Sequence, residues 1–188
     1  MFLYIEHELL GVSNTLLPYL LLFLFGVSEL SDAFDGYVAR RYNQVTDLGK
    51  LLDPMADSIY RISVFLTFTR PPVDLPLLLV FIFLYRDSVI STLRTICAFR
   101  GFALAARASG KVKAIIQAAS AFIILIMMIP HSLGLITQST LHYTAFTVTA
   151  IAVIYALFSG IEYIFANREY VIRLLTIENE KKAKENSL

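Results

Sequence analysis

Two long apolar stretches decide the fold: residues 111–129 read KVKAIIQAASAFIILIMMI, and residues 141–165 read LHYTAFTVTAIAVIYALFSGIEYIF. A helix needs roughly 20 mostly apolar residues to cross a bilayer, because lipid offers the backbone no hydrogen-bond partners. Three further stretches upstream meet this requirement, and Pro130 is expected to end the helix that begins at residue 111. The sequence therefore predicts five transmembrane helices, at residues 15–41, 47–69, 76–99, 111–129 and 141–165.

The composition supports this interpretation. The 188 residues are 57% apolar and only 16% charged, against roughly a quarter charged in an ordinary soluble domain. The mean hydropathy is +0.66 and the net charge is +1. These values argue against a soluble globular domain and a disordered chain, and they give no electrostatic basis for binding nucleic acid. Cys97 is the single cysteine and cannot form an internal disulfide. The expected fold class is an all-α integral membrane protein.

Short connections between the five stretches indicate one helical domain, residues 1–173, followed by a charged cytoplasmic tail at 174–188. Residues 1–10 are apolar but too short to cross a bilayer, and they lack the basic start of a signal peptide. Lysine and arginine flank the first and third connections and fill the tail, whereas the second connection has only Arg70 and the fourth has none. Because cytoplasmic loops carry an excess of these residues, the basic segments are expected to face the cytoplasm.

Four aspartates lie near the predicted cytoplasmic ends of the first two helices: Asp32, Asp35, Asp53 and Asp57. Ionisable groups inside membrane helices are costly and usually line a polar site. Spacings of three and four residues place each pair on one helix face. If the chain reverses between residues 41 and 47, Asp35 and Asp53 both lie roughly 9 Å above the turn. The sequence therefore predicts that the two pairs face each other.

Carboxylates gathered in this way suit Mg²⁺ or Mn²⁺, and a pair of such ions is a recurring solution for phosphoryl transfer. Gly36 and Gly49 would permit close helix packing or the approach of a ligand. Arg40 stands about one turn from Asp35, where it could meet a phosphate. The alternative is a buried ion-pair network with Arg40 and Arg61 that only holds the helices together. Four acids against two arginines would leave excess negative charge in such a network.

The acidic stretch resembles the signature of the CDP-alcohol phosphotransferase family at every fixed position. The matching residues are Asp32, Asp35, Gly36, Ala39, Arg40, Gly49, Asp53 and Asp57. Weaker similarity to the branch of the family that forms phosphatidylglycerophosphate covers residues 86–94, 110–117 and 159–163. Family members have six membrane helices, and residues 1–10 look like the end of a truncated first helix. Three residues usual in the family are replaced here by Ser58, Asp87 and Ala114.

The resemblance implies transfer of the phosphatidyl group of CDP-diacylglycerol to the 1-hydroxyl of sn-glycerol 3-phosphate, with release of CMP. It implies two Mg²⁺ or Mn²⁺ ions held by the four aspartates, with Asp57 also serving as general base. The residues associated with the CDP moiety would be Gly36, Ala39, Arg40 and Gly49. A homodimer in the bacterial inner membrane, with its active site toward the cytoplasm, is implied as well.

An acceptor that carries a phosphate requires a second, basic pocket opposite the acids. The candidates are Arg94, Arg107, Lys111 and Lys113. Their alternative role is an ordinary basic flank that meets anionic lipid headgroups. Arg86 and Asp87 are expected to have separate partners on other helices, because adjacent helix residues do not face each other. Arg61 is expected to neutralise or orient Asp57, four residues before it.

Two other interpretations stay open. The chemistry could be the same with another acceptor, such as inositol phosphate, serine or a second lipid, because the signature does not fix the acceptor. The same carboxylates could also serve a divalent-cation transporter. Transporters tend to place internal repeats and broken helices at the bilayer midplane, whereas this sequence shows no repeat and its acidic residues lie toward one face of the membrane.

Overall fold

The structure is a computed structural model that describes residues 13–42, 47–99 and 107–170, together with residues 11, 101 and 172. Within these ranges the regular elements are the helices α2 (Leu17–Arg41), α3 (Asp47–Thr67), α4 (Leu77–Phe99), α5 (Ala108–Ser132) and α6 (Gln138–Ala166). The predicted all-α fold is confirmed, and each predicted span corresponds to one helix. The predicted segment at residues 1–10 and the tail at 174–188 lie outside the described residues.

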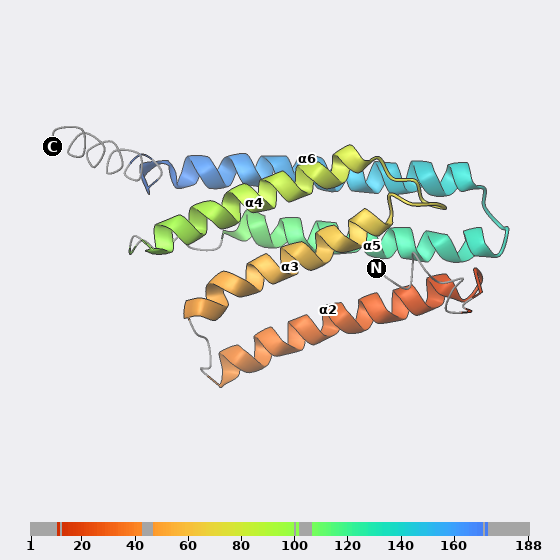
Figure 1. Cartoon of the computed structure of the whole chain (residues 1–188), viewed down its shortest axis with the longest axis horizontal. Helices are drawn as coiled ribbons and strands as arrows, with labels where there is room; N and C mark the ends of the chain where they lie inside the picture. The colour runs from red at the N-terminus through yellow and green to blue at the C-terminus, as the bar shows by residue number, and fades with distance from the viewer. Residues whose placement is uncertain are drawn as a thin grey trace.

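The helices run up and down in an elongated bundle, and successive helices are antiparallel (Figure 1). Helices α5 and α6 pack along each other, α4 packs against α3 and α6, and α2 packs mainly against α5. The C-terminal ends of α2, α4 and α6 and the N-terminal ends of α3 and α5 therefore lie at the same end of the bundle (Figure 1). We call it the basic end, because it carries Arg41, Arg94, Arg107 and Lys111.

Aromatic side chains fill much of the interior and join neighbouring helices. Phe65 of α3 and Phe83 of α4 are 1% and 0% exposed, and their ring centroids are 5.2 Å apart. Phe25 of α2 lies edge-on against Phe122 of α5, with ring centroids 4.7 Å apart. Buried small residues such as Ala152 on α6 allow close helix approach. Van der Waals packing of this kind holds the bundle together where lipid removes the hydrophobic driving force.

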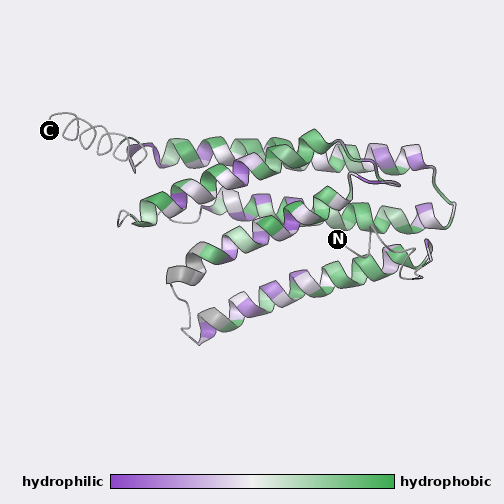
Figure 2. Ribbon diagram, viewed as in Figure 1, coloured by the Kyte–Doolittle hydropathy of each residue, from purple (hydrophilic) through white to green (hydrophobic). Residues whose placement is uncertain are grey.

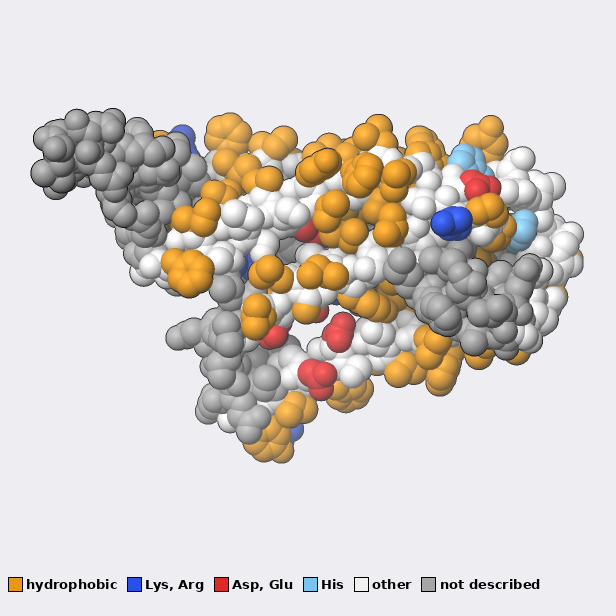
Figure 3. Space-filling view, viewed as in Figure 1, with side chains coloured by type: hydrophobic (Ala, Val, Ile, Leu, Met, Phe, Trp, Pro, Cys, Tyr) orange, Lys and Arg blue, Asp and Glu red, His pale blue; other side chains and the backbone are white. Residues whose placement is uncertain are grey.

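Hydrophobic side chains also cover the outside of the bundle. Leu78 of α4 and Ile154 of α6 are 69% and 68% exposed. Hydrophobic residues make up much of each helix (Figure 2), and hydrophobic side chains lie on the face of the molecule shown in Figure 3. Such an extensive apolar surface is unfavourable in water but matches lipid. Among the described helices, α2, α5 and α6 are long and apolar enough to cross a membrane, whereas α3 and α4 carry several charged residues. The chain is an integral membrane protein.

The predicted end of the fourth span at Ile129 is wrong, because α5 continues through Pro130 to Ser132. Proline removes one helix hydrogen bond and its ring crowds the preceding turn. Here it lies in the last turn, where few hydrogen bonds remain to be formed. The Leu133 N–H still donates to the Ile129 carbonyl at 3.2 Å, and the helix ends with the turn that follows.

Helix α6 begins at Gln138, three residues before the predicted start at residue 141. The cause is Thr137, whose side-chain oxygen accepts a hydrogen bond from the Thr140 N–H at 3.2 Å. This N-cap satisfies one of the backbone donors that the first turn of a helix leaves free. Because capping residues are polar, a criterion based on apolar runs places the start of the helix too late.

The α3–α4 aromatic contact predicts a stability effect. Phe83→Ala would leave a cavity against Phe65, and we expect it to lower the free energy of unfolding by about 3 kcal/mol. The matched control is Phe81→Ala on the same helix, since Phe81 is 38% exposed. Thermal unfolding in detergent would measure the stability of both purified variants. Equal midpoints for the two variants would contradict this account of the core.

Candidate functional site

The four aspartates of the signature lie on α2 and α3, which follow each other in the chain and run antiparallel (Figure 1). Acidic side chains flank the gap between these two helices (Figure 3). Asp32, Asp35 and Asp53 are exposed, and Asp57 is half-buried. Helix α2 packs mainly against α5 and α3 against α4, and the two helices of the acidic pairs approach each other less closely, with contacts such as Phe25 with Tyr60 and Glu29 with Arg61.

The carboxylates share one electrostatic neighbourhood without converging on one point. Asp57 lies within range of the charges of Asp32 and Asp53. Across the described ranges, however, no three acidic, histidine or cysteine side chains are placed to hold a metal ion together. The predicted ion cage thus remains a prediction. The donor chemistry fits divalent ions, because these are hard oxygen ligands and no ion pair among the described residues neutralises them.

The charge of Arg61 acts on Asp57, as expected, but the ion-pair partner of Arg61 is Glu29. Its Nε lies 3.6 Å from Glu29 Oε1, which links α3 to α2, while Asp57 remains only within its longer electrostatic range. Among the described residues, Arg61 and the aspartates therefore do not form the ion-pair network that was the alternative interpretation. Arg61 can reach Glu29 because the separation of α2 and α3 leaves room for long side chains.

The residues associated with the CDP moiety lie beside the acidic gap. Gly36 is half-buried on α2 and Gly49 is half-buried in the first turn of α3. Ala39 and Arg40 belong to α2 by their backbone, but their side chains lie outside the described part of the structure. The predicted contact of these four residues with a nucleotide therefore remains a prediction.

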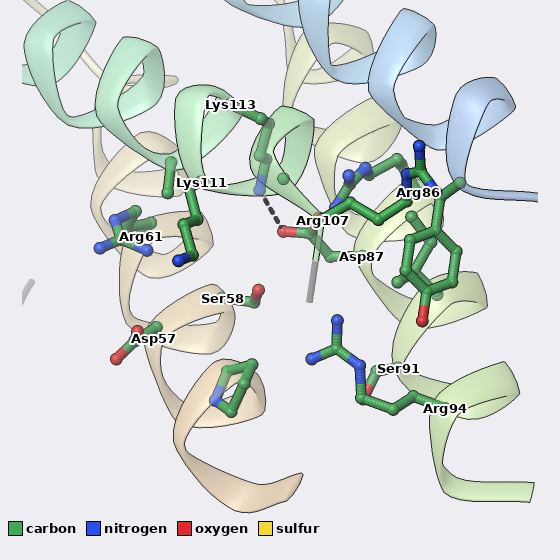
Figure 4. Close-up of a pocket in the computed structure, with 15 residues that line it drawn as sticks. Asp57, Ser58, Arg61, Arg86, Asp87, Ser91, Arg94, Arg107, Lys111 and Lys113 are labelled. Atoms are coloured by element: carbon green, nitrogen blue, oxygen red, sulfur yellow. Dashed lines mark hydrogen bonds and ion pairs between the residues drawn. The ribbon is translucent and has the colours of Figure 1, made fainter. Parts of the chain in front are cut away.

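A cavity of about 220 Å³ opens among α3, α4, α5 and α6 near the basic end (Figure 4). Its charged lining consists of Arg61, Arg86, Arg94, Arg107, Lys111, Lys113, Asp57 and Asp87. All four candidates for acceptor-phosphate binding line this one cavity, although they are spread over residues 94–113. Six basic side chains against two acidic ones make the cavity suited to an anion. Asp57 also lines this cavity and thereby connects it to the acidic gap between α2 and α3.

Two of the basic side chains already share one carboxylate inside the protein, which leaves one positive charge in excess. Lys113 Nζ donates to Asp87 Oδ2 at 2.6 Å, and both side chains are 5% exposed. Arg86 Nη1 donates to Asp87 Oδ1 at 2.9 Å, and Arg86 Nη2 donates to Ser159 Oγ at 2.7 Å. The expected partners on other helices exist for Arg86 and Asp87. The expectation that these neighbours do not meet each other is wrong, because the long arginine side chain bends back to the carboxylate.

The other basic side chains of the cavity differ in whether they already have a partner inside the protein. Arg94 lies over the ring of Tyr163, 5.9 Å from its centroid, and the buried Arg94 Nε has no hydrogen-bond partner in the described ranges. The Lys111 side chain extends into the cavity between Arg61 and Ser58 (Figure 4). Arg107 Nη2 pairs with Glu162 Oε1 at 2.5 Å on the cavity rim. Arg94 and Lys111 are thus the cations best placed to accept an anion.

Sequence reasoning missed three contributors to this cavity. Arg61 and Arg86 line it although neither was assigned to the acceptor pocket. Tyr163 lines it as well, and the residues around Tyr163 were noticed only as part of a weak family resemblance. A usable signal existed for Arg86: a cation well inside an apolar helix is costly and usually faces a polar site.

A basic cavity beside an acidic gap, set within a helical membrane bundle, defines a membrane protein built to handle anionic groups. The chain belongs to the CDP-alcohol phosphatidyltransferase family, whose model matches residues 7–158. The family resemblance expected from the signature is thereby confirmed.

Several curated proteins are similar to this chain in sequence. The chain is 34% identical over 108 residues to a CDP-diacylglycerol–glycerol-3-phosphate 3-phosphatidyltransferase of Rickettsia felis, covering 56% of this chain and 58% of the relative. It is 31% identical over 147 residues to the Bacillus subtilis protein of that name, covering 78% and 72%. It is also 37% identical over 81 residues to a cardiolipin synthase (CMP-forming) of Streptomyces coelicolor, covering 43% and 37%. The chain thus spans little more than half the length of the Rickettsia relative.

The buried charge cluster predicts a stability effect of its own. Asp87→Asn would leave the buried Lys113 ammonium without its counter-charge, and we expect a loss of roughly 3 kcal/mol or more in unfolding free energy. Asp74→Asn is the matched control, because Asp74 meets Gln138 at an exposed site near the opposite end. Adding Lys113→Met to Asp87→Asn should restore part of the loss. If Asp87→Asn unfolded at the same temperature as Asp74→Asn, the structural role of the cluster would be refuted.

Proposed function

We propose that the chain transfers the phosphatidyl group of CDP-diacylglycerol to the 1-hydroxyl of sn-glycerol 3-phosphate, which yields phosphatidylglycerophosphate and CMP. The observation that carries this proposal is the single cavity that has Asp57 on one wall and Arg94 and Lys111 on others. It supplies a carboxylate that can accept a proton beside cations that can hold a phosphate. The activity named for the Rickettsia and Bacillus relatives supports the same assignment.

In the proposed reaction, Arg94 and Lys111 bind the phosphate of the acceptor and leave its 1-hydroxyl directed toward Asp57. Charge-assisted hydrogen bonds from both cations suit a phosphate, and the arginine can form two in parallel. The hydroxyl oxygen attacks the phosphorus that carries the diacylglycerol, and its proton passes to the Asp57 carboxylate. The bond from that phosphorus to the CMP oxygen breaks, and CMP leaves.

The four aspartates of α2 and α3 are the residues that would hold two Mg²⁺ or Mn²⁺ ions. When bound, such ions would neutralise the diphosphate of the lipid substrate and offset the charge that develops on CMP. Arg40, with Gly36, Ala39 and Gly49, would contact the CDP moiety.

The setting of the reaction follows from the same geometry. The basic end is expected to face the cytoplasm, because cytoplasmic segments carry an excess of lysine and arginine. We therefore propose an active site just inside the cytoplasmic face of the bacterial inner membrane, where a lipid and a water-soluble acceptor can both arrive. A homodimer is part of the proposal through the family resemblance alone.

The size of the cavity favours a small acceptor over a second lipid. At about 220 Å³ it is below the range of roughly 300–1,000 Å³ common for drug-sized ligands. Its lining is also strongly basic, which favours an acceptor that carries a phosphate over serine. The Streptomyces relative named as a cardiolipin synthase keeps a lipid acceptor as the second candidate.

An acceptor panel tests the proposal directly. Purified protein with CDP-diacylglycerol and Mg²⁺ or Mn²⁺ should release CMP with glycerol 3-phosphate, and only weakly with inositol phosphate, serine or phosphatidylglycerol. Release should stop when EDTA removes the ions. Asp53→Asn should lower kcat by roughly a hundredfold or more, while Asp74→Asn should not. Undiminished release by Asp53→Asn would eliminate the metal-assisted scheme.

The acceptor site has a separate prediction. Arg94→Ala should raise the KM for glycerol 3-phosphate by roughly ten- to a hundredfold, as expected for losing hydrogen bonds to a charged group. The KM for CDP-diacylglycerol should change much less. Arg70→Ala, in the connection after α3, serves as the control for loss of a positive charge elsewhere. An unchanged KM for glycerol 3-phosphate in Arg94→Ala would remove this residue from the acceptor site.

A further inference from the structure

One turn of α6, residues 159–163, touches three arginines that come from other parts of the chain. The first contact involves Arg86 of α4, whose Nη2 donates to Ser159 Oγ at 2.7 Å. Gly160 lies beside the stem of the same arginine. A Cβ at Gly160 would stand 3.1 Å from Arg86 Cγ, so only glycine leaves the arginine in its present place without a shift.

The second contact involves Arg94, which lies closer to the basic end of α4. Its guanidinium lies 5.9 Å from the ring centroid of Tyr163. Tyr163 is 3% exposed, and its hydroxyl has no hydrogen-bond partner in the described ranges. The ring face is therefore the part of Tyr163 that contacts Arg94.

The third contact involves Arg107, which immediately precedes α5. Its Nη2 pairs with Glu162 Oε1 at 2.5 Å, and Ser109 donates to the other oxygen of the same carboxylate. Glu162 thereby ties the N-terminal end of α5 to α6. Since Arg107 lines the cavity, this pair also fixes one side of its rim.

We propose that the turn at residues 159–163 is a positioning element. It holds the arginines of the cavity in place and thereby determines the affinity of the cavity for a phosphate. The proposal rests on the function proposed above and deepens it. An arginine side chain has many rotamers, and an anion site gains affinity when its donors are held in place before binding. Arg86 is also held by Asp87 of its own helix, whereas the groups that contact Arg94 and Arg107 stand on α6.

Tyr163 provides the decisive pair of variants. Tyr163→Leu removes the ring under Arg94, and Tyr163→Phe keeps the ring while removing a hydroxyl that has no partner. We expect Tyr163→Leu to raise the KM for glycerol 3-phosphate about fivefold, with kcat within about twofold of wild type. Tyr163→Phe should keep most of the wild-type affinity for glycerol 3-phosphate. A merely structural role would not separate KM from kcat in this way.

Gly160→Ala gives an independent variant that is expected to fold, since alanine is a better helix former than glycine. Its added methyl group displaces Arg86, and we expect a KM increase of roughly two- to threefold. Phe158→Leu is the control on the same helix, because Phe158 is 60% exposed and does not line the cavity. It should match wild type in both constants.

Binding of inorganic phosphate to the full chain in detergent, measured by calorimetry, separates this inference from the proposed function. The dissociation constant should rise in Tyr163→Leu and Gly160→Ala and stay near wild type in Tyr163→Phe and Phe158→Leu. Equal constants in all five proteins, or no phosphate binding by wild type, would overturn the positioning role. Phosphate binding without CMP release from any acceptor would instead overturn the proposed reaction and leave the positioning role to be judged on the binding series.

Discussion

The buried pair of Lys113 and Asp87 is the interaction on which the basic end of the bundle depends. In a low-dielectric interior, two opposite charges at 2.6 Å are stable only as a pair, and the loss of either partner strands the other. Asp87 also accepts from Arg86, which reaches Ser159. One run of polar contacts thus joins α5, α4 and α6 and fixes three walls of the cavity. The free cations of the cavity can face a ligand because this pair holds the walls in place.

A second constraint is the separation of charge within the membrane protein. The four signature aspartates lie on α2 and α3, while five of the six cations of the cavity lie in α4, in α5 or directly before α5. Asp57 borders both regions. In the proposed reaction this division matches the two substrates, since a diphosphate needs metal ions held by acids and an acceptor phosphate needs basic side chains. Both groups lie at one end of the bundle, where a lipid and a soluble compound can meet.

The partners of individual charged side chains were the least predictable part of the site. Arg61 was expected to meet Asp57 on its own helix but approaches Glu29 on α2. Lys113 was expected to be available to a ligand but is neutralised by Asp87. Spacing along a helix says which residues share a face, but a long side chain can choose among partners on several helices. That choice depends on the gaps between helices, which no local pattern contains.

The sequence by itself determined the five helices, the membrane location, the positions of the four aspartates and the segregation of basic residues to one end. These follow from local constraints, since a lipid-exposed backbone must be helical and a span must be long and apolar. Only the tertiary structure decided that α2 packs mainly on α5 and less closely on α3, and that residues spread from Asp57 to Tyr163 line one cavity. Helix packing sets those distances, because it depends on the shapes of all contacting faces at once rather than on the order of residues along any one of them.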